Sequence, residues 1–534
     1  MHEPRHPLPL TGAPLDMAAL RAVLAGPVAA SLPEAAGQRI AAGRAALERA
    51  LAGGQPIYGT TTGVGAMKRT EHHGEALRDF NAGLALAHQV AVGEEMPPGL
   101  SRLVLALRLN TVAGGRVGVT PGFSAFLAQM LNHDLLPVLH ARGSVGCGDL
   151  GQMGEVAAVM AGHGMAVLKG ETMPAAEALA RAGLAPYAMQ PREGLAAVAV
   201  NAFGLARTAA AVIRAADAMR QAMAQSLTTA AAWGLDRAVW QAARQSLIPG
   251  EAALADWLLA ATEGTAWPRR DSVHDALSGR FLVQIFAASL GAAVEAARSV
   301  QLHSAQVDDN PVILDGRVVA SGASLLSDLS LRLATLQLAM AQLARNVLNR
   351  CLMLTGGQLP GLAVNLVPPG IIGTGYGPLM KLAQEQSVRI TLAAQPAAPL
   401  NLPLAAGLED EALLIPLAAE RLDQQALALE WLLAIEALLA VQALDQRGLA
   451  PGRIAALQTA IVRRHFAPFT EDRPVSAPLS ALRADLCAAR GQLFAAAPFL
   501  PLDEEMALPS DPPQREGSFP ARAGNTIASP DPVQ

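Results

Sequence analysis

The strongest constraint on the fold is a long run rich in Leu and Ala at residues 326–354, LSDLSLRLATLQLAMAQLARNVLNRCLML. Its apolar side chains recur at helical spacing, which predicts one continuous helix. Another apolar segment, residues 426–444, contains Glu430 and Glu436, which a membrane-spanning helix would rarely expose to lipid. We therefore expect a buried helix there, and no membrane partner. Both segments predict a large bundle of long helices.

The composition supports extensive burial. The chain has 534 residues, of which 51% are hydrophobic, 16% charged and 4% aromatic. A net charge of -5 without a basic tract gives no reason to expect nucleic acid as a partner. The first residues lack the apolar core of a signal peptide, so we expect a cytoplasmic protein. Cys147, Cys351 and Cys487 are widely spaced and odd in number, which indicates neither a disulfide framework nor a metal site.

We expect a mostly α-helical fold, with active-site loops gathered at a long central helical bundle. Residues 1–15 are expected to be flexible, and the Pro-, Ser- and Gly-rich residues 498–534 to be disordered. Residues 16–497 are interpreted as a single body. Its expected parts are a loop-rich N-terminal part to about residue 203, a central bundle over about 204–450, and C-terminal helices over 451–497.

A glycine-rich sequence, GSVGCGDL at residues 143–150, precedes an apolar helical pattern over residues 151–168. It predicts a tight loop at a helix N-terminus, where free N–H groups favour negative charge. Such a position lowers the pKa of a thiol, which would make Cys147 reactive. A buried glycine turn with an incidental cysteine is an equal alternative.

Two further side chains lie in the N-terminal part. Tyr58 begins the glycine- and threonine-rich sequence YGTTTGVGAMKR, which predicts a loop. A tyrosine on such a loop can act as a general acid or base, although an ordinary surface loop is the more frequent case. His88 lies in a helical pattern over residues 77–92, where a core histidine bonded to a carbonyl is the simpler interpretation.

Other polar residues interrupt apolar patterns later in the chain. Asn201 lies within residues 192–204, which we expect to begin a helix. Arg280 stands where a long apolar helix begins, and its guanidinium can bind a substrate carboxylate or form a structural salt bridge. Lys381 falls in the first turn of a helix expected over residues 379–394.

Glu409 is followed directly by Asp410 and Glu411. Acidic residues in the first turn of a helix complement its dipole. Taken alone, this cluster therefore indicates a structural role.

Together, these motifs resemble the histidine and aromatic amino acid ammonia-lyase family over about residues 50–440. YGTTTGVG resembles the family's Tyr-Gly-Val-Asn-Thr-Gly-Phe-Gly loop, with its catalytic tyrosine at Tyr58. LALAHQVAVG resembles its Leu-Ser-His-Ala-Ala-Gly helix at His88. HDALSGRFLVQ resembles Gln-Asp-Pro-Tyr-Ser-Leu-Arg with a following Gln, which places the carboxylate-binding arginine at Arg280.

Two later motifs complete the resemblance. DDNP matches the family's Asp-Asn-Pro at residues 309–311, and GLEDE resembles Asn-Gln-Glu-Asp-His, with the amine-proximal glutamate at Glu409. The resemblance implies a helical fold with a central bundle, and a homotetramer whose active sites are completed by several subunits. It also implies elimination of an amine from an α-amino acid to give an α,β-unsaturated acid.

The sequence departs from the family at the cofactor-forming loop. There the family continues Gly-Ser-Val-Gly with Ala-Ser-Gly-Asp-Leu, and Ala-Ser-Gly cyclises into the electrophile methylidene-imidazolone. Here GSVG is followed by CGDL, so one residue is missing and no serine stands at the centre. Other family positions also differ; they are occupied by Thr61, Ala199, Leu277, Gly322, Ala323 and Ser324.

Two chemical interpretations follow. In one, Gly146-Cys147-Gly148 cyclises, because loss of sulfide from Cys gives the same methylidene group as loss of water from Ser. In the favoured one there is no cofactor, and the substrate carries a nitrogen that already leaves easily, such as the trimethylammonium of a histidine betaine. The superfamily's ergothionases, which eliminate trimethylamine from ergothioneine, are the precedent.

In the favoured interpretation Tyr58 abstracts a β-proton, and Arg280 holds the substrate carboxylate. His88 and Asn201 are further candidates for substrate binding, and Lys381 and Glu409 for contact with a thioimidazole ring. A catalytically inactive scaffold or small-molecule binder is the alternative of another class. Retention of Tyr58 together with the other motif residues argues against it, since a fold alone needs none of them.

Overall fold

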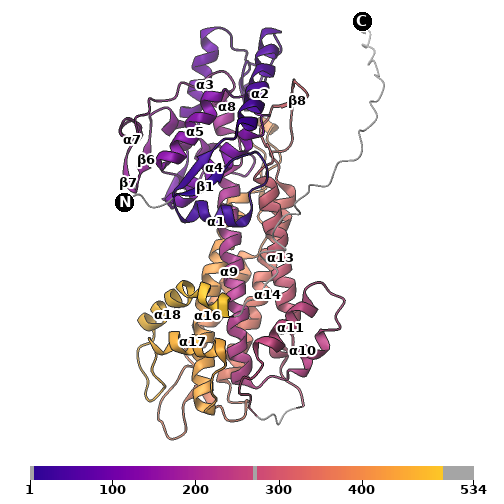
Figure 1. The fold of residues 1–534 in the computed structure, drawn as a ribbon, viewed down its shortest axis with the longest axis vertical. Coiled ribbons are helices and arrows are strands. Elements are labelled where there is room, and N and C mark those ends of the chain that lie inside the picture. The colour runs from indigo at the N-terminus through magenta and orange to yellow at the C-terminus, as the bar shows by residue number, and fades with distance from the viewer. Residues whose placement is uncertain (1–4, 269–272, 497–534) are drawn as a thin grey trace.

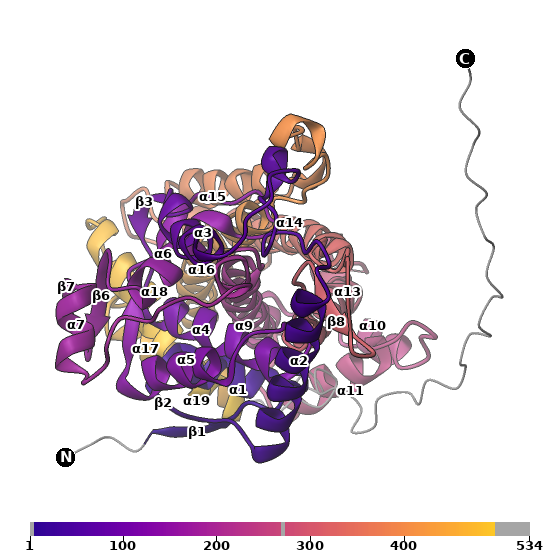
Figure 2. The ribbon, with the colours of Figure 1, turned by 90° about the horizontal axis from the view of Figure 1, so that it is seen from above.

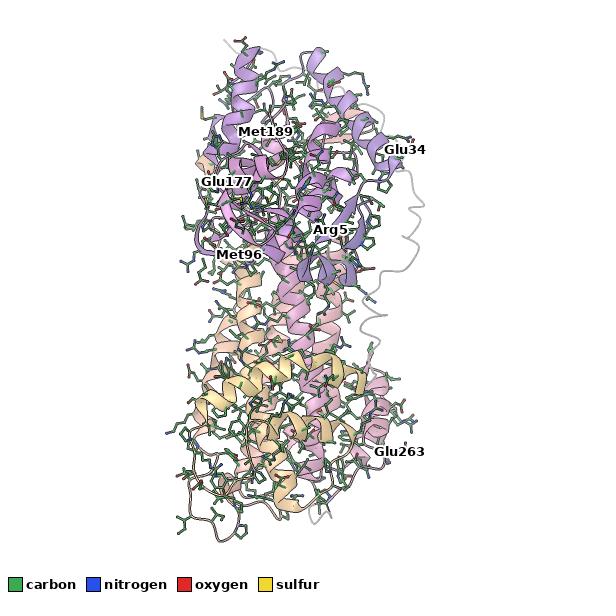
Figure 3. The ribbon with its side chains drawn as sticks, turned by 60° about the vertical axis from the view of Figure 1, so that its left-hand side comes forward. Arg5, Glu34, Met96, Glu177, Met189 and Glu263 are labelled. Atoms are coloured by element: carbon green, nitrogen blue, oxygen red, sulfur yellow. The ribbon has the colours of Figure 1, made fainter. Side chains whose placement is uncertain are left out.

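The structure is a computed structural model and describes residues 5–268 and 273–496. Figure 1 shows an elongated molecule in which a compact N-terminal part caps one end of a bundle of long helices. In Figure 3, Met96 and Met189 lie in this N-terminal part, and Glu263 lies at the opposite end of the molecule. The predicted tail, residues 498–534, lies outside the described residues.

The bundle confirms the predicted fold class. Its long helices are α9 (Ala202–Trp233), α13 (Leu282–His303), α14 (Ser327–Thr355), α15 (Leu379–Ala393) and α16 (Ile415–Arg447). α14 matches the helix predicted over residues 326–354, and α15 the one predicted over 379–394. α13 and α14 are antiparallel. The Ser299 hydroxyl donates to Asp328 at one end (2.7 Å), and the Asn346 amide donates to the Ser278 carbonyl at the other (2.9 Å).

α16 contains the acidic residues that interrupt its apolar sequence, and each finds a cationic partner. Glu436 accepts hydrogen bonds of 2.6 and 3.0 Å from Arg350, with both side chains fully buried. Glu430 binds Arg214, Arg483 and Arg490. The helical segments Glu193–Trp233 and Ile415–Arg447 are long and apolar enough to cross a membrane, yet their apolar windows are 83% and 89% buried within the fold. Burial in the core explains this composition.

The N-terminal part combines short strands with helices. Its helices are α1 (Met17–Ala25), α2 (Glu34–Ala52), α3 (Glu75–Ala87), α4 (Pro98–Ala113), α5 (Pro121–His133), α6 (Leu150–Met160), α7 (Ala175–Arg181) and α8 (Glu193–Val198). Its strands are β1 (His6–Pro9), β2 (Val28–Ser31), β3 (Val92–Glu95), β4 (Leu135–Pro137), β5 (His140–Arg142), β6 (Met165–Leu168) and β7 (Glu171–Pro174). β1 pairs with β2 in parallel, β3 pairs with β5, and β4, β6 and β7 form an antiparallel sheet.

Shorter elements surround the bundle. These are α10 (Ala238–Ala243), α11 (Glu251–Ala261), α12 (Leu277–Arg280), α17 (Arg453–Arg463), α18 (Ser476–Ala488) and α19 (Arg490–Ala496). The predicted hairpin near residues 307–316 is present as β8 (Val312–Leu314) and β9 (Arg317–Val319). Seen from above, the hairpin lies beside α2 (Figure 2).

Two expectations need correction. Residues 1–15 were expected to be flexible, but in the described part of this segment, residues 5–15, β1 pairs with β2, and Leu8, Leu10 and Leu15 are buried in the core. The apolar side chains of this short segment give it enough burial to be held in place. The helix expected over residues 192–204 is also interrupted, since α8 ends at Val198 and α9 begins at Ala202.

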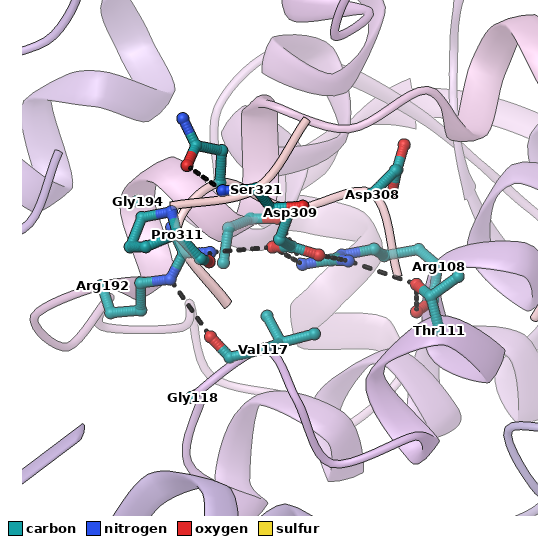
Figure 4. A network of polar contacts seen from close by, with 12 residues as sticks. Arg108, Thr111, Val117, Gly118, Arg192, Gly194, Asp308, Asp309, Pro311 and Ser321 are labelled. Atoms are coloured by element: carbon teal, nitrogen blue, oxygen red, sulfur yellow. Dashed lines mark hydrogen bonds and ion pairs between the residues drawn. The ribbon is translucent and has the colours of Figure 1, made fainter. Parts of the chain in front are cut away.

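A buried ion network fixes the loop that leads into the hairpin (Figure 4). Asp309 accepts two hydrogen bonds from Arg108, of 2.9 and 3.0 Å, and one of 3.1 Å from Arg192. Arg192 also donates to the Pro311 carbonyl (2.8 Å). All three charged side chains are about 1% exposed. The network thereby joins α4, the start of α8 and the hairpin in the core.

We expect Asp309→Asn to destabilise the fold by about 3–5 kcal/mol, because it leaves two buried guanidinium groups without their shared carboxylate. Asp315→Asn, at the exposed tip of the same hairpin, is the matched control and should change stability by less than about 0.5 kcal/mol. Chemical unfolding of the two variants measures the difference. Equal stabilities would contradict the structural role of the network.

Candidate active site

A pocket of about 670 Å³ lies where the N-terminal loops meet the hairpin and the loop that precedes α16. Sequence-predicted residues that line it are Tyr58, His88, Cys147, Gly148 and Glu409. The same pocket is lined by residues that the motif analysis did not assign to a site, among them Lys68 and Asp308, and by Ala199 and Ser324. The chain thus brings together six separate segments of the sequence.

The Cys147 loop, residues 143–149, is held at both ends by hydrogen bonds. Ser144 donates its hydroxyl to Asp149 (2.6 Å) and accepts the Gly146 N–H (2.9 Å). Asp149 in turn accepts the N–H of Gly204 in the first turn of α9 (2.7 Å). Gly146 has a φ of +77°, and a Cβ there would lie 2.6 Å from the Ile415 nitrogen. A side chain at position 146 would therefore collide with the start of α16.

Asn201 lies beneath this loop. Its Oδ1 accepts the Gly148 N–H (2.8 Å), and its Nδ2 donates to Asp308 (3.0 Å) and to the Ser324 carbonyl (2.8 Å). These contacts engage the whole amide, and Asn201 is not among the lining residues of the pocket. These hydrogen bonds position the Cys147 loop. Direct substrate binding by Asn201 stays a prediction.

The thiol of Cys147 differs from its expected reactive state. Burial raises its pKa above that of an ordinary thiol, the Ser324 hydroxyl 3.8 Å from Sγ opposes the rise, and the charges of Glu409, Asp149 and Asp308 add to it. The expectation of a lowered pKa at a helix N-terminus is therefore wrong. Desolvation and nearby carboxylates outweigh the helix dipole here. At neutral pH the group is a neutral thiol.

Two buried carboxyl groups adjoin the Cys147 loop. Burial raises the pKa of Asp149 to about 6, against hydrogen bonds from Gly204 and Ser144 that favour its charged form. Burial also raises the pKa of Asp308 to about 6, and the charge of Asp309 adds to the rise. Asp308 accepts the backbone N–H of Asn201 (2.7 Å). Sequence reasoning missed both residues as parts of the site. The doubled acid in DDNP was the available signal for Asp308.

Tyr58 and His88 present polar atoms to the pocket. The Gly65 N–H donates to Tyr58 Oη (2.9 Å), which fixes the phenol against its own loop. His88 Nδ1 lies 2.8 Å from the Leu84 carbonyl, so the proton of the neutral ring belongs on Nδ1. Nε2 is then an acceptor. The expected hydrogen bond of His88 to a carbonyl is present, but the residue is half-buried and lines the pocket, so it is not a core histidine.

Glu409 is a loop residue, because α16 begins at Ile415. The helix-dipole interpretation of its acidic cluster is therefore wrong. A short helical turn before it, η4 (Ala405–Gly407), packs against η1 (Gly65–Met67) of the Tyr58 loop. A Cβ on Gly65 would lie 3.8 Å from Glu409 Oε1. Glu409 is thus placed across a short gap from the backbone that holds Tyr58.

Arg280 and Lys381 do not line this pocket within one chain. Arg280 ends α12 next to Ser278, which is bonded to Asn346 at the far end of α14. Asp328, near Ser324 of the pocket, and Asn346 are separated by about 27 Å along the axis of α14. Lys381 is exposed in the first turn of α15. Across the described residues, no cluster of three or more metal-ligating side chains occurs.

Comparison with known proteins agrees with this architecture. A family model described as aromatic amino acid lyase matches residues 15–464. Histidine ammonia-lyase of Gloeobacter violaceus is 33% identical over 88% of this chain and 93% of the relative. The enzyme of Paracidovorax citrulli is 29% identical over 88% of this chain and 94% of the relative. The fold is similar to that of Treponema denticola ergothionase, solved with desmethyl-ergothioneine sulfonic acid (TM-score 0.87, 24% identity, covering 91% and 99% of the two chains).

We expect Cys147 to react with iodoacetamide near neutral pH more slowly than free cysteine, because a raised pKa lowers the fraction of the reactive thiolate. Glu409→Gln removes one of the charges that raise the pKa and should speed the reaction. Peptide mass mapping at timed intervals measures the rate, with the urea-unfolded protein as the control. Alkylation as fast as that of free cysteine would contradict the raised pKa.

Proposed function

Since the chain belongs to the aromatic amino acid lyase family and is a carbon–nitrogen lyase, we propose that it eliminates trimethylamine from a histidine betaine such as ergothioneine, in the cytoplasm, to give an α,β-unsaturated acid. The observation that carries the proposal is the Cys147 loop itself. It has Gly-Cys-Gly where the family has Ala-Ser-Gly, and the Gly148 N–H is bonded to Asn201.

The loop does not fit the family's methylidene-imidazolone. Ring closure would require the Gly148 nitrogen to bond to the Gly146 carbonyl carbon, and that nitrogen would lose the N–H it donates to Asn201. The residue at the centre is a cysteine with a raised pKa in place of serine. Without an electrophile to activate an amine, the leaving group must be activated in the substrate. A quaternary ammonium meets this need, because it departs as a neutral amine.

The charge around the pocket supports a cationic substrate. Glu409 and Asp308 line it together with one lysine, Lys68, and Asp149 lies directly behind the Cys147 loop, so acidic groups outnumber the lysine there. The neutral Cys147 thiol adds no positive charge. A trimethylammonium group donates no hydrogen bonds, so a protein recognises it through negative charge and through a cavity large enough for its methyl groups.

The elimination can be written on residues of this chain. Tyr58 acts as a phenolate: it takes a proton from the β-carbon and becomes a neutral phenol, the electrons of that C–H bond form the Cα–Cβ double bond, and the electron pair of the C–N bond leaves with trimethylamine. The Gly65 N–H holds Tyr58 Oη in place for this transfer. In this proposal His88 Nε2, as an acceptor, and Glu409 bind the imidazole-derived ring; both residues line the pocket.

A second copy of the chain supplies Arg280 and Lys381 in this proposal, as part of a homotetramer. Large apolar side chains are exposed along the bundle, including Leu331 (71%), Leu338 (66%) and Leu392 (63%). Such a stripe favours burial against another copy. An antiparallel neighbour would bring its α12 end to this pocket, where its Arg280 would bind the substrate carboxylate and its Lys381 the ring.

We expect the purified protein to release trimethylamine from ergothioneine and to have an intact mass equal to that of the unmodified sequence. A mass lower by sulfide plus water would instead establish a cyclised Cys147 loop and favour an ammonia-lyase or aminomutase. Tyr58→Phe should lower kcat by about 10²–10⁴-fold through loss of the base. Protein that neither binds nor converts any imidazole or aromatic amino acid or betaine would favour an inactive scaffold.

Shared active sites predict complementation between inactive variants. Tyr58→Phe and Arg280→Ala should each be inactive alone, because each lacks one essential group. Refolding them together in equal amounts should restore about a quarter of wild-type activity, since that share of sites combines an intact pocket with an intact arginine. Recovery of no activity in mixed oligomers would show that both residues act from the same chain.

A further inference from the structure

Asp308 is a nearly buried carboxylate that no motif accounts for. It is 7% exposed and lines the pocket directly before the hairpin. Its Oδ2 accepts hydrogen bonds from the backbone N–H and the side-chain amide of Asn201, of 2.7 and 3.0 Å. In Figure 4 its side chain points away from the ion network beside it. Asp308 is therefore oriented apart from the cations that its neighbour binds.

The two adjacent acids have different partners. Asp309 forms ion pairs with both Arg108 and Arg192. Among the described residues, Asp308 forms no ion pair. A buried carboxylate without a counter-ion is costly, and the raised pKa of about 6 reflects this cost. Above that pH the folded protein holds an ionised acid at the wall of an open pocket, where the charge of Arg108 and the hydrogen bonds from Asn201 offset the effect of burial only in part. An acid with a perturbed pKa in a pocket marks a candidate functional site, and the negative charge of this one is complementary to a cationic ligand.

The wall around Asp308 offers room for a bulky cation. Four residues that line the same pocket, Gly148, Ala199, Cys147 and Ser324, have small side chains. The thiol is neutral, and the Ser324 carbonyl is already engaged by Asn201. The negative charge of Asp308 and the small neighbouring side chains thus suit a bulky cation in the same pocket.

On the basis of the function proposed above, we propose that Asp308 binds the quaternary ammonium group of the substrate and selects such cations over free amines. A carboxylate holds a primary amine in its protonated form, which has no lone pair for attack on an electrophile. A trimethylammonium needs no such lone pair. The acid thus favours the substrate class that leaves without activation.

The expected kinetic signature separates binding from catalysis. The nitrogen loses its positive charge as it departs, so Asp308 stabilises the bound substrate at least as well as the transition state. Its loss should raise KM for ergothioneine without lowering kcat. A residue with a merely structural role would lower kcat or the amount of folded tetramer instead.

The test compares three forms of the protein: wild type, Asp308→Asn and Asp315→Asn. Asn at position 308 keeps an acceptor for Asn201, and Asp315→Asn makes the same change at the exposed hairpin tip. We expect Asp308→Asn to raise KM for ergothioneine at least tenfold and to weaken binding of tetramethylammonium by a similar factor. Asp315→Asn should change neither. Unchanged KM and tetramethylammonium affinity in Asp308→Asn would overturn the inference.

A pH profile gives a test that needs no variant. Below pH 6 Asp308 becomes neutral, so wild-type affinity for tetramethylammonium should fall toward acid, by up to tenfold per pH unit. Affinity independent of pH in this range would overturn the inference. Several titratable or charged groups surround Asp308 and contribute to the profile: Tyr58, Lys68, His88, Arg108, Cys147, Asp149, His303, Asp309 and Glu409. The change assigned to Asp308 is the part that Asp308→Asn abolishes.

The outcomes distinguish this inference from the proposed function. Wild type that releases trimethylamine while Asp308→Asn binds as well as wild type leaves the function standing and removes the role of Asp308. Wild type that releases no trimethylamine contradicts the proposed function. Tetramethylammonium binding lost in Asp308→Asn would then still support the cation site.

Discussion

The start of α9 is the point on which the site depends. The first N–H groups of a helix have no carbonyl partner within the helix, and here two buried acids accept them. Asp149 takes the N–H of Gly204, and Asp308 takes the N–H of Asn201. One acid comes from the Cys147 loop and the other from the segment before the hairpin. The same hydrogen bonds therefore satisfy the helix end and bring two distant segments to one pocket. Asn201 completes the junction by bonding Gly148, Asp308 and the Ser324 carbonyl.

Charge is distributed unequally across this junction. Asp309 is paired with two arginines and is structural, while Asp308 and Asp149 have pKa values raised to about 6 because burial disfavours their ionised forms. An acid whose pKa is higher in the folded state than in the unfolded chain costs stability as pH rises from its unfolded pKa to its folded one. Near neutral pH, ionisation of Asp149 and of Asp308 therefore lowers the stability of the folded protein. Burial raises the pKa of Cys147, and the charges of these two acids add to the rise, so the thiol stays protonated beside a pair of acidic groups.

Much of this was predictable from sequence where a local signal was strong. The periodic apolar pattern gave α14 almost to the residue, and the glycine-rich and motif segments led to Tyr58, His88, Cys147 and Glu409, which line one pocket. The rest depended on contacts between distant segments. The break before Asn201 follows from acids more than fifty residues away on either side, which no window of sequence around it contains. The raised pKa of Cys147 likewise comes from desolvation and remote carboxylates, and the helix-terminus argument considered only the local backbone. β1 was underestimated because its pairing strand lies beyond α1.

Activation of a leaving amine can reside either in the enzyme or in the substrate. An electrophilic cofactor converts an ordinary amine into a leaving group, and it needs a loop able to cyclise and a neutral amine to attack it. This chain places a cysteine between glycines at that loop, bonds the Gly148 nitrogen, and adds a carboxylate that would keep an amine protonated. Under the proposed function these features favour the second route, the departure of a nitrogen that is already quaternary. Under the proposed function, the base at Tyr58 remains necessary in both cases, because the β-proton must leave whichever way the nitrogen is activated. That requirement explains why the tyrosine loop can stay while the electrophile-forming loop changes.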